Sequence, residues 1–311
     1  MIKRLLSFIP LFICLFLISR IAALTVSHFN EQSVGYKILN PLADPLKAAT
    51  YVITSFTRPE FSKVVLEGLV GEKGIYAVAV YDLKTGHFFY YNEHKKFQSA
   101  SLYKLWIMEQ TYQSVANKSL GSDDVLSSDV AALNADFGIA SESAELKEGS
   151  ITMTTQFAVS QMITISHNYA ALLLSKEVGL QNVQQFLKSN GFEDSHIGQP
   201  PITSAYDIAS FYRKLYFGQL VNPTISKDML SLLKKQQIND RIPKYLPEKV
   251  EVAHKTGELD YVKHDAGIVF SKKGDYIVVF LSETSNPSHA AEVEAHLSKV
   301  IYDYIQQYKD I

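Results

Sequence analysis

The segments that the sequence predicts as strands lie near both ends of the folded part of the chain, with a long helical stretch between them. Residues 75–81 (IYAVAVY) and 87–91 (HFFYY) are rich in apolar, β-branched and aromatic residues and flank a DLKTG turn. Further strands are predicted at 250–255, 267–271 and 276–282, the last two around a KKGD turn. Because strands satisfy their backbone groups by pairing, we expect the two sets to meet in one sheet, with the helical middle as a second lobe.

The helical segments complete this two-lobed pattern. Apolar residues recur at helical spacing in residues 61–69 and form a stripe along residues 293–308, which predicts a helix at each end of the domain. Helices in the middle are predicted at 102–115, 156–165, 169–176, 183–187 and 205–216. The expected fold is therefore α/β, of the α+β two-lobed type: an antiparallel sheet flanked by terminal helices, plus an all-helical lobe. A pocket is expected between the lobes.

The first 26 residues have the composition of a targeting segment. Lys3 and Arg4 precede an apolar run at 5–19. This run is shorter than the roughly 20 residues that a membrane span needs, and its length suits a secretory signal. Residues 1–26 are predicted to be either a signal peptide or a retained N-terminal membrane anchor through residues 5–19. Both alternatives make the rest of the chain extracytoplasmic: secreted, periplasmic or anchored in the cell envelope.

A proline-containing connector is predicted at 27–58, followed by one folded domain at 59–311. The formal net charge of −2 leaves no basic excess, which argues against a nucleic-acid partner. The single cysteine, Cys14, lies in the apolar run, so the domain has neither a disulfide nor a thiol nucleophile. The histidines lack paired metal-binding spacing, and we expect no metal and no cofactor. The domain is expected to be a monomer.

Three short motifs with chemically useful side chains follow one another along the domain. They are Ser101-Leu102-Tyr103-Lys104, Ser166-His167-Asn168 and Lys255-Thr256-Gly257. The spacing of three puts Ser101 and Lys104 one turn apart on the same face of a helix, which Ser101 is predicted to open. A serine hydroxyl attacks well only when a base takes its proton, and Lys104 is the base that the motif supplies. Lys104 must then be neutral, which requires burial or a nearby positive charge such as that of Lys255.

In this order, and with their flanking residues, the motifs resemble those of class A β-lactamases and penicillin-binding proteins. The flanking blocks are SASLYKLWI, MITISHNYAALLL and HDAG, and the resemblance covers residues 60–308. It implies a β-lactamase/transpeptidase-like fold and a role for each motif residue. Ser101 would be the nucleophile, Lys104 the general base and Ser166 a proton relay; Asn168, Lys255, Thr256 and Gly257 would bind the substrate; and the backbone N–H groups of Ser101 and Glu258 would form the oxyanion hole.

The sequence departs from class A β-lactamases at two places. His167 stands where those enzymes have aspartate, which favours penicillin-binding proteins slightly. The Glu-x-x-x-Asn motif, whose glutamate positions the water that releases the acyl-enzyme, is absent from the shortened segment 191–203. Glu193, Asp194 and His196 are the alternatives there for a deacylation base, and the sequence does not choose among them.

Three functions remain open at this point. The first is a serine hydrolase that resembles class A β-lactamases and opens a β-lactam, or a related cell-wall peptide amide, through an acyl-enzyme on Ser101. The second is a penicillin-binding D-Ala-D-Ala peptidase-like protein with slow deacylation. The third is a catalytically silent extracytoplasmic binding domain, in which Ser101 would serve only as a helix N-cap. The complete set of three motifs favours the two enzymes.

Overall fold

The computed structural model describes residues 53–56 and 58–308, so the predictions for residues 1–26 and for most of the connector lie outside the described residues. The end of the predicted connector is part of the sheet. Strand β1 (Ile53–Phe56) pairs antiparallel with β3 (Phe88–Tyr91) and lies at the sheet edge. Within the described residues, no helix is long and apolar enough to cross a membrane.

One six-stranded antiparallel sheet joins the two ends of the domain, as predicted, in the order β1-β3-β2-β10-β9-β8. Its other strands are β2 (Ile75–Asp82), β8 (Glu251–Leu259), β9 (Val262–Phe270) and β10 (Tyr276–Glu283). Strands β2 and β10 pair in the centre, with Val78 opposite Phe280, and both are apolar almost throughout because the sheet is covered on both faces.

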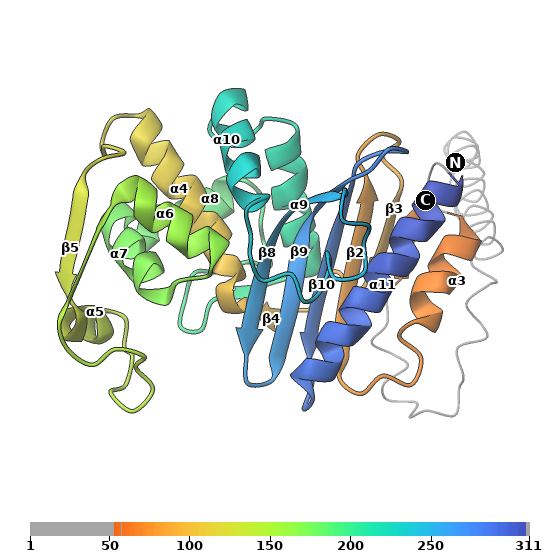
Figure 1. Ribbon diagram of the computed structural model, residues 1–311, viewed down its shortest axis with the longest axis horizontal. Helices are drawn as coiled ribbons and strands as arrows, with labels where there is room; N and C mark the ends of the chain where they lie inside the picture. The colour runs from red at the N-terminus through yellow and green to blue at the C-terminus, as the bar shows by residue number, and fades with distance from the viewer. Residues whose placement is uncertain (1–52, 57, 309–311) are drawn as a thin grey trace, which may run out of the picture. The chain divides into compact units, whose positions relative to one another are not determined.

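The terminal helices α3 (Pro59–Glu67) and α11 (Pro287–Tyr308) pack against each other beside the sheet (Figure 1). Phe61 joins them to the sheet, because its ring makes edge contacts with Tyr304 of α11 at 5.0 Å and with Phe89 of β3 at 6.0 Å. Helix α9 (Ala205–Tyr216) contacts β2, β9 and β10, and its buried residues join the main hydrophobic core.

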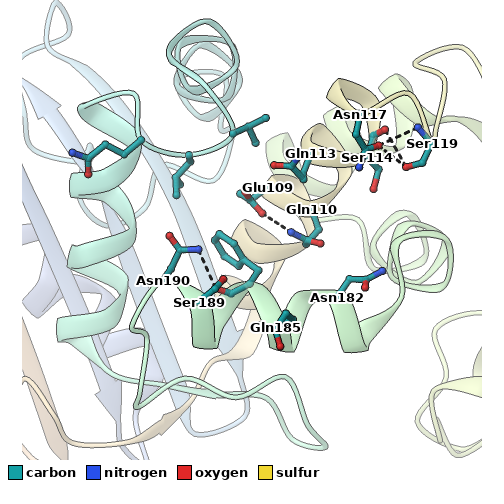
Figure 2. Close-up of a pocket in the computed structure, with 14 residues that line it drawn as sticks. Glu109, Gln110, Gln113, Ser114, Asn117, Ser119, Asn182, Gln185, Ser189 and Asn190 are labelled. Carbon is teal, nitrogen blue, oxygen red and sulfur yellow. Dashed lines mark hydrogen bonds between the residues drawn. The ribbon is translucent and has the colours of Figure 1, made fainter.

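The second lobe contains α4 (Lys104–Ala116), α5 (Val130–Asp136), α6 (Thr155–Thr164), α7 (Asn168–Val178), α8 (Leu180–Ser189) and α10 (Pro223–Leu233) (Figure 1). The prediction that this lobe is all-helical is wrong. Strands β5 (Val125–Asp129) and β6 (Ser150–Thr154) form an antiparallel pair within it. Both strands are short and carry serine and threonine on an exposed ribbon, so their apolar pattern is weak. A cavity of about 570 Å³ lies between α4, α8 and residues 219–221 of this lobe (Figure 2).

Two boundaries near the motifs differ from the prediction. The helix expected at 102–115 is preceded by a 3₁₀ turn, η3 (Ala100–Tyr103), and Ser101 lies in this turn rather than opening an α-helix. Strand β8 continues past Lys255 to Leu259, so the third motif lies within a strand and not at its end.

Candidate active site

Ser101 is held by a short strand pair and a buried helix. Strand β4 (Phe97–Gln98) pairs with β7 (Ile202–Thr203), and the Ser99 N–H donates to the Pro201 carbonyl at 2.8 Å. Ala100 then has a φ of +45°, which turns the chain into η3. Ser101 is half-buried, whereas Leu102 beside it is fully buried and fixes the turn in the core.

Lys104 is fully buried, and its ammonium group contacts the second motif. Lys104 Nζ donates hydrogen bonds to the Ser166 carbonyl at 2.6 Å, to Ser166 Oγ at 3.3 Å and to Asn168 Oδ1 at 2.7 Å. Burial lowers the pKa of Lys104 to about 7, against an opposing effect of the Glu145 charge. Lys104 therefore loses its proton more readily than an ordinary lysine.

Lys255, on strand β8, contacts Ser166 as Lys104 does. Lys255 Nζ donates to Ser166 Oγ at 3.0 Å and to the Thr256 carbonyl at 2.8 Å. Burial, and after it the charge of Lys104, lowers the pKa of Lys255 well below its ordinary value. Ser166 itself has a left-handed φ of +60°, between α6 and α7, and thus presents both its carbonyl and its hydroxyl to Lys104.

Gly257 brings the third motif against the backbone of the first. A Cβ at this position would meet the Ser99 carbonyl at 3.1 Å, Ala100 Cβ at 3.2 Å and Ser101 N at 3.3 Å. Such contacts are tighter than most that side chains make, so glycine permits the close approach of β8. The structure thus places the Ser101 N–H beside the strand that continues into Glu258, the second backbone donor predicted for an oxyanion hole.

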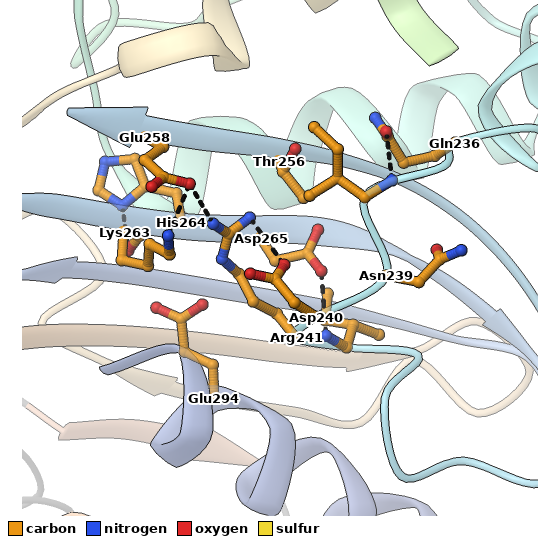
Figure 3. Close-up of polar contacts among 12 residues, drawn as sticks. Gln236, Asn239, Asp240, Arg241, Thr256, Glu258, Lys263, His264, Asp265 and Glu294 are labelled. Carbon is orange, nitrogen blue, oxygen red and sulfur yellow. Dashed lines mark hydrogen bonds and ion pairs between the residues drawn. The ribbon is translucent and has the colours of Figure 1, made fainter. Parts of the chain in front are cut away.

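The Glu258 side chain belongs to a charged cluster formed by β8, β9 and the loop between α10 and β8 that carries Arg241 (Figure 3). Its carboxylate accepts from Arg241 Nη2 at 2.7 Å and pairs with Lys263 Nζ at 2.6 Å. Although partial burial opposes ionisation, Lys263 and Arg241 together lower the pKa of Glu258. Arg241 is fully buried and belongs to no sequence motif, so sequence reasoning missed it.

Two buried histidines form polar contacts between strands β8, β9 and β4. His254 Nδ1 lies 2.9 Å from Asp265 Oδ1. His264 Nε2 lies 2.9 Å from the Gln98 carbonyl, three residues before Ser101, and burial lowers the pKa of His264 to about 4. Within the described residues, no group of three or more His, Cys, Asp and Glu side chains is placed to hold a metal ion.

Glu145 is a further neighbour of the site that sequence reasoning missed. Its Oε1 accepts a hydrogen bond from Asn168 Nδ2, while Asn168 Oδ1 binds Lys104. The loop that carries Glu145 is fixed by the next residue, because the Leu146 N–H donates to the Tyr169 hydroxyl at 3.0 Å. The loop is polar and contains several acidic residues without a motif, so no pattern along the chain distinguishes Glu145 from the others.

His167, the departure in the second motif, begins helix α7. Its Nδ1 accepts from the Ala170 N–H at 3.2 Å and acts as an N-cap. This contact gives His167 a local structural function.

Segment 191–203 does not bring its predicted deacylation candidates to the motif residues. The backbones of His196 and Ile202 exchange two hydrogen bonds at 3.0 Å, which closes the segment into a small loop. Asp194 pairs with His94 at 2.7 Å and lies 3.9 Å from Lys96, whereas the side chains of Glu193 and His196 are exposed. Among the described residues, none of the three candidates hydrogen-bonds to Ser101, Lys104 or Ser166.

Comparison with known sequences decides the family. The profile of Beta-lactamase2, described as the β-lactamase enzyme family, matches residues 61–305. The chain belongs to the β-lactamase enzyme family. The match spans both lobes and all three motifs of this β-lactamase-family chain. Comparison with curated proteins found no significant match.

Solved structures share the fold of this β-lactamase-family chain. PBP-A matches with a TM-score of 0.70 and 20% identity, over 80% of this chain and 96% of its own. A β-lactamase from Sphaerobacter thermophilus matches with a TM-score of 0.70 and 23% identity, over 79% and 97%. A PBP-A variant, solved as an acyl-enzyme complex with penicillin G, matches with a TM-score of 0.69 and 20% identity, over 79% and 96%. These similarities establish the β-lactamase/transpeptidase-like fold.

Proposed function

We propose that the protein is a serine hydrolase that opens a β-lactam, or a related cell-wall peptide amide, through an acyl-enzyme on Ser101. The observation that carries the proposal is the convergence of Lys104 and Lys255 on Ser166, with the pKa of Lys104 lowered to about 7. A lysine that is partly neutral at physiological pH can act as a general base, whereas an ordinary surface lysine cannot. Membership of the β-lactamase enzyme family supports a hydrolase.

In the proposed acylation, neutral Lys104 accepts the proton of Ser101 Oγ as this oxygen attacks the carbonyl carbon of the amide. The backbone N–H groups of Ser101 and Glu258 stabilise the resulting oxyanion. When the intermediate collapses, the C–N bond breaks, and the leaving nitrogen takes a proton through Ser166, which hydrogen-bonds to both lysines. Asn168 and Thr256 hold the substrate, and Lys255 supplies positive potential for its carboxylate.

Slow deacylation is the second candidate, as in a penicillin-binding D-Ala-D-Ala peptidase-like protein. It is favoured by the position of Glu193, Asp194 and His196, which make no hydrogen bond to the motif residues among the described part of the chain. The silent binding domain is the weaker alternative, because a fully buried lysine with a lowered pKa costs stability and a binding domain has no need of it.

Turnover separates these functions. The full chain is mixed with benzylpenicillin, and the hydrolysed product is measured over time by mass spectrometry. Ser101→Ala is the variant expected to be inactive. Ser231→Ala, on an exposed helix face, is the matched control. Multiple turnovers by the wild type and Ser231→Ala, with none by Ser101→Ala, support a β-lactamase. A single stoichiometric acylation supports the penicillin-binding alternative, and no reaction contradicts both.

We also propose an extracytoplasmic location. Members of the β-lactamase family are generally secreted or periplasmic, which supports it. The predicted signal or anchor at residues 1–26 lies outside the described residues.

A further inference from the structure

The cavity between α4 and α8 shares no lining residue with the candidate active site. It is a hollow open to solvent, because lining side chains such as Asn182, Gln185 and Gln219 are exposed, and its volume of about 570 Å³ falls within the roughly 300–1,000 Å³ range of small-molecule pockets. Its walls come from the middle and end of α4, one face of α8 and residues 219–221 (Figure 2). Nothing in the proposed acyl-enzyme chemistry uses it.

The lining is polar and almost uncharged. Ten of the fourteen lining residues are asparagine, glutamine or serine, and Glu109 is the only ionisable one. No lysine or arginine among the described residues lines the cavity, so the described lining offers no cation to hold a phosphate, sulfate or carboxylate. The side chains instead offer many neutral donors and acceptors along its walls.

Several of these amides are held in place by the helices and keep one end available. Asn182 Nδ2 donates to the Val178 carbonyl at 2.7 Å and Asn190 Nδ2 to the Phe186 carbonyl at 3.0 Å, which leaves both Oδ1 atoms as acceptors. Asn117 is oriented the opposite way: its Oδ1 accepts from Ser119 Oγ at 2.7 Å, which leaves Nδ2 as a donor.

Glu109 and Val221 add two further features of a ligand site. The Glu109 side chain is only 3% exposed and bonds Gln110 Nε2 at 2.9 Å, and burial raises the pKa of its carboxyl to about 7. Near neutral pH this group can therefore donate or accept. Val221 has a left-handed φ of +57°, rare for a β-branched residue, and strain of this kind gathers at functional sites.

We propose that this cavity binds a neutral disaccharide. Each sugar hydroxyl both donates and accepts, and hydroxyls on the two rings can reach the acceptors of Asn182 and Asn190, which lie eight residues apart along α8 and its end, and the donor of Asn117. The volume accommodates such a ligand, and the absence of lining cations disfavours an anionic one. The proposal does not depend on catalysis at Ser101.

Saturation-transfer NMR reads binding directly, and the single tryptophan provides a second, indirect readout. Trp106 is buried in α4, one turn before Glu109, and it is the only tryptophan of the chain. The full chain is titrated separately with cellobiose and with N,N′-diacetylchitobiose, followed by Trp106 fluorescence and by saturation-transfer NMR of the sugar protons. A sulfated disaccharide serves as the anionic comparison.

The variants are Asn182→Ala and Gln185→Ala, combined, with Gln181→Ala as the control on an exposed, non-lining position of the same helix. We expect saturable binding of at least one neutral disaccharide, weakened at least tenfold in the double variant and unchanged in Gln181→Ala. Acylation of Ser101 by penicillin should be the same in all three proteins, which separates this test from that of the proposed function. No binding of either neutral sugar, equal binding by the double variant, or equal binding of the sulfated sugar would overturn the proposal.

Discussion

Lys104 and Lys255 donate hydrogen bonds to one acceptor, the hydroxyl of Ser166, at 3.3 Å and 3.0 Å. Both side chains are fully buried, and two ammonium groups at such a short separation repel each other. Burial lowers the pKa of both lysines, and the charge of Lys104 lowers that of Lys255 further. The acylation proposed for Ser101 needs a neutral lysine near pH 7, and these lowered pKa values favour one.

The rate of acylation should follow the ionisation of Lys104. Because only its neutral form accepts the serine proton, the second-order rate constant with benzylpenicillin should rise with pH and level off above about 7. Stopped-flow measurement between pH 5 and pH 9 gives the profile. Lys104→Met, which keeps the length of the side chain without a base, should lose about a hundredfold or more in rate. A profile that is flat across this range would contradict the role of Lys104.

Glu145 should set the midpoint of that profile. Its charge raises the pKa of Lys104, so Glu145→Gln, which keeps a hydrogen-bonding side chain beside Asn168, should move the midpoint to lower pH. Glu142→Gln, on the same loop, is the matched control and should leave the midpoint in place. The electrostatic link between Glu145 and Lys104 fails if both variants behave alike.

A side chain at Gly257 should interfere with the oxyanion hole. In Gly257→Ala, the new Cβ would press on the Ser99 carbonyl and on Ser101 N at 3.1 and 3.3 Å, and would move the two backbone donors apart. We expect acylation to slow by about tenfold to a thousandfold, the range seen when one oxyanion donor is lost. Thermal denaturation serves as the check on folding. An acylation rate within twofold of the wild type would show that β8 need not approach so closely.

His264 should make the fold sensitive to acid. Burial lowers the folded-state pKa of His264 from 6.5 to about 4, so the unfolded state binds a proton that the folded state refuses between these values. The contribution of neutral His264 to the free energy of unfolding is fully present above about pH 6.5 and is lost as the pH falls toward 4. From pH 7 to pH 5 the free energy of unfolding should fall by about 2 kcal/mol through this residue alone.

Urea denaturation at pH 7 and at pH 5 measures how far the free energy of unfolding falls between these two pH values. In His264→Gln, whose amide can still donate to the Gln98 carbonyl, the difference between the two pH values should shrink by that amount. An unchanged difference would mean that other groups cause the acid sensitivity.

The exposed candidates of segment 191–203 should not control release of the acyl group. Glu193→Gln and His196→Ala should each leave the lifetime of the acyl-enzyme within about twofold of the wild type, because neither side chain bonds to the motif residues among the described positions. The lifetime is measured by rapid-quench mass spectrometry after a pulse of penicillin. A tenfold longer lifetime in either variant would identify that residue as the deacylation base.

The sequence predicted the sheet well because its central strands are strongly apolar. The segment 75–81 and its partner 276–282 are buried along almost their whole length, and such strands require a sheet that is covered on both faces. The ribbon of β5 and β6 escaped prediction because its alternation is mostly of serine, threonine and single apolar residues, which is also typical of loops.

The motif residues were found by spacing and context, whereas their supporting neighbours were not. Ser101, Lys104, Ser166 and Lys255 belong to short patterns that can be read along the chain. Arg241 and Glu145 reach the site only through tertiary contacts with Glu258 and Asn168, from segments that carry no pattern of their own. The sequence allows either burial or the charge of Lys255 to lower the pKa of Lys104, and in the structure burial lowers it.

The intact mass of the full chain after brief exposure to benzylpenicillin tests the central claim, acylation of Ser101, most directly. The wild type should gain the mass of one penicillin molecule, because ring opening loses no atoms, and peptide mapping should place the addition on Ser101. Ser101→Ala should gain nothing. An adduct on both proteins, or an adduct mapped to another residue, would contradict the account, as would a wild type that gains no mass and consumes no penicillin.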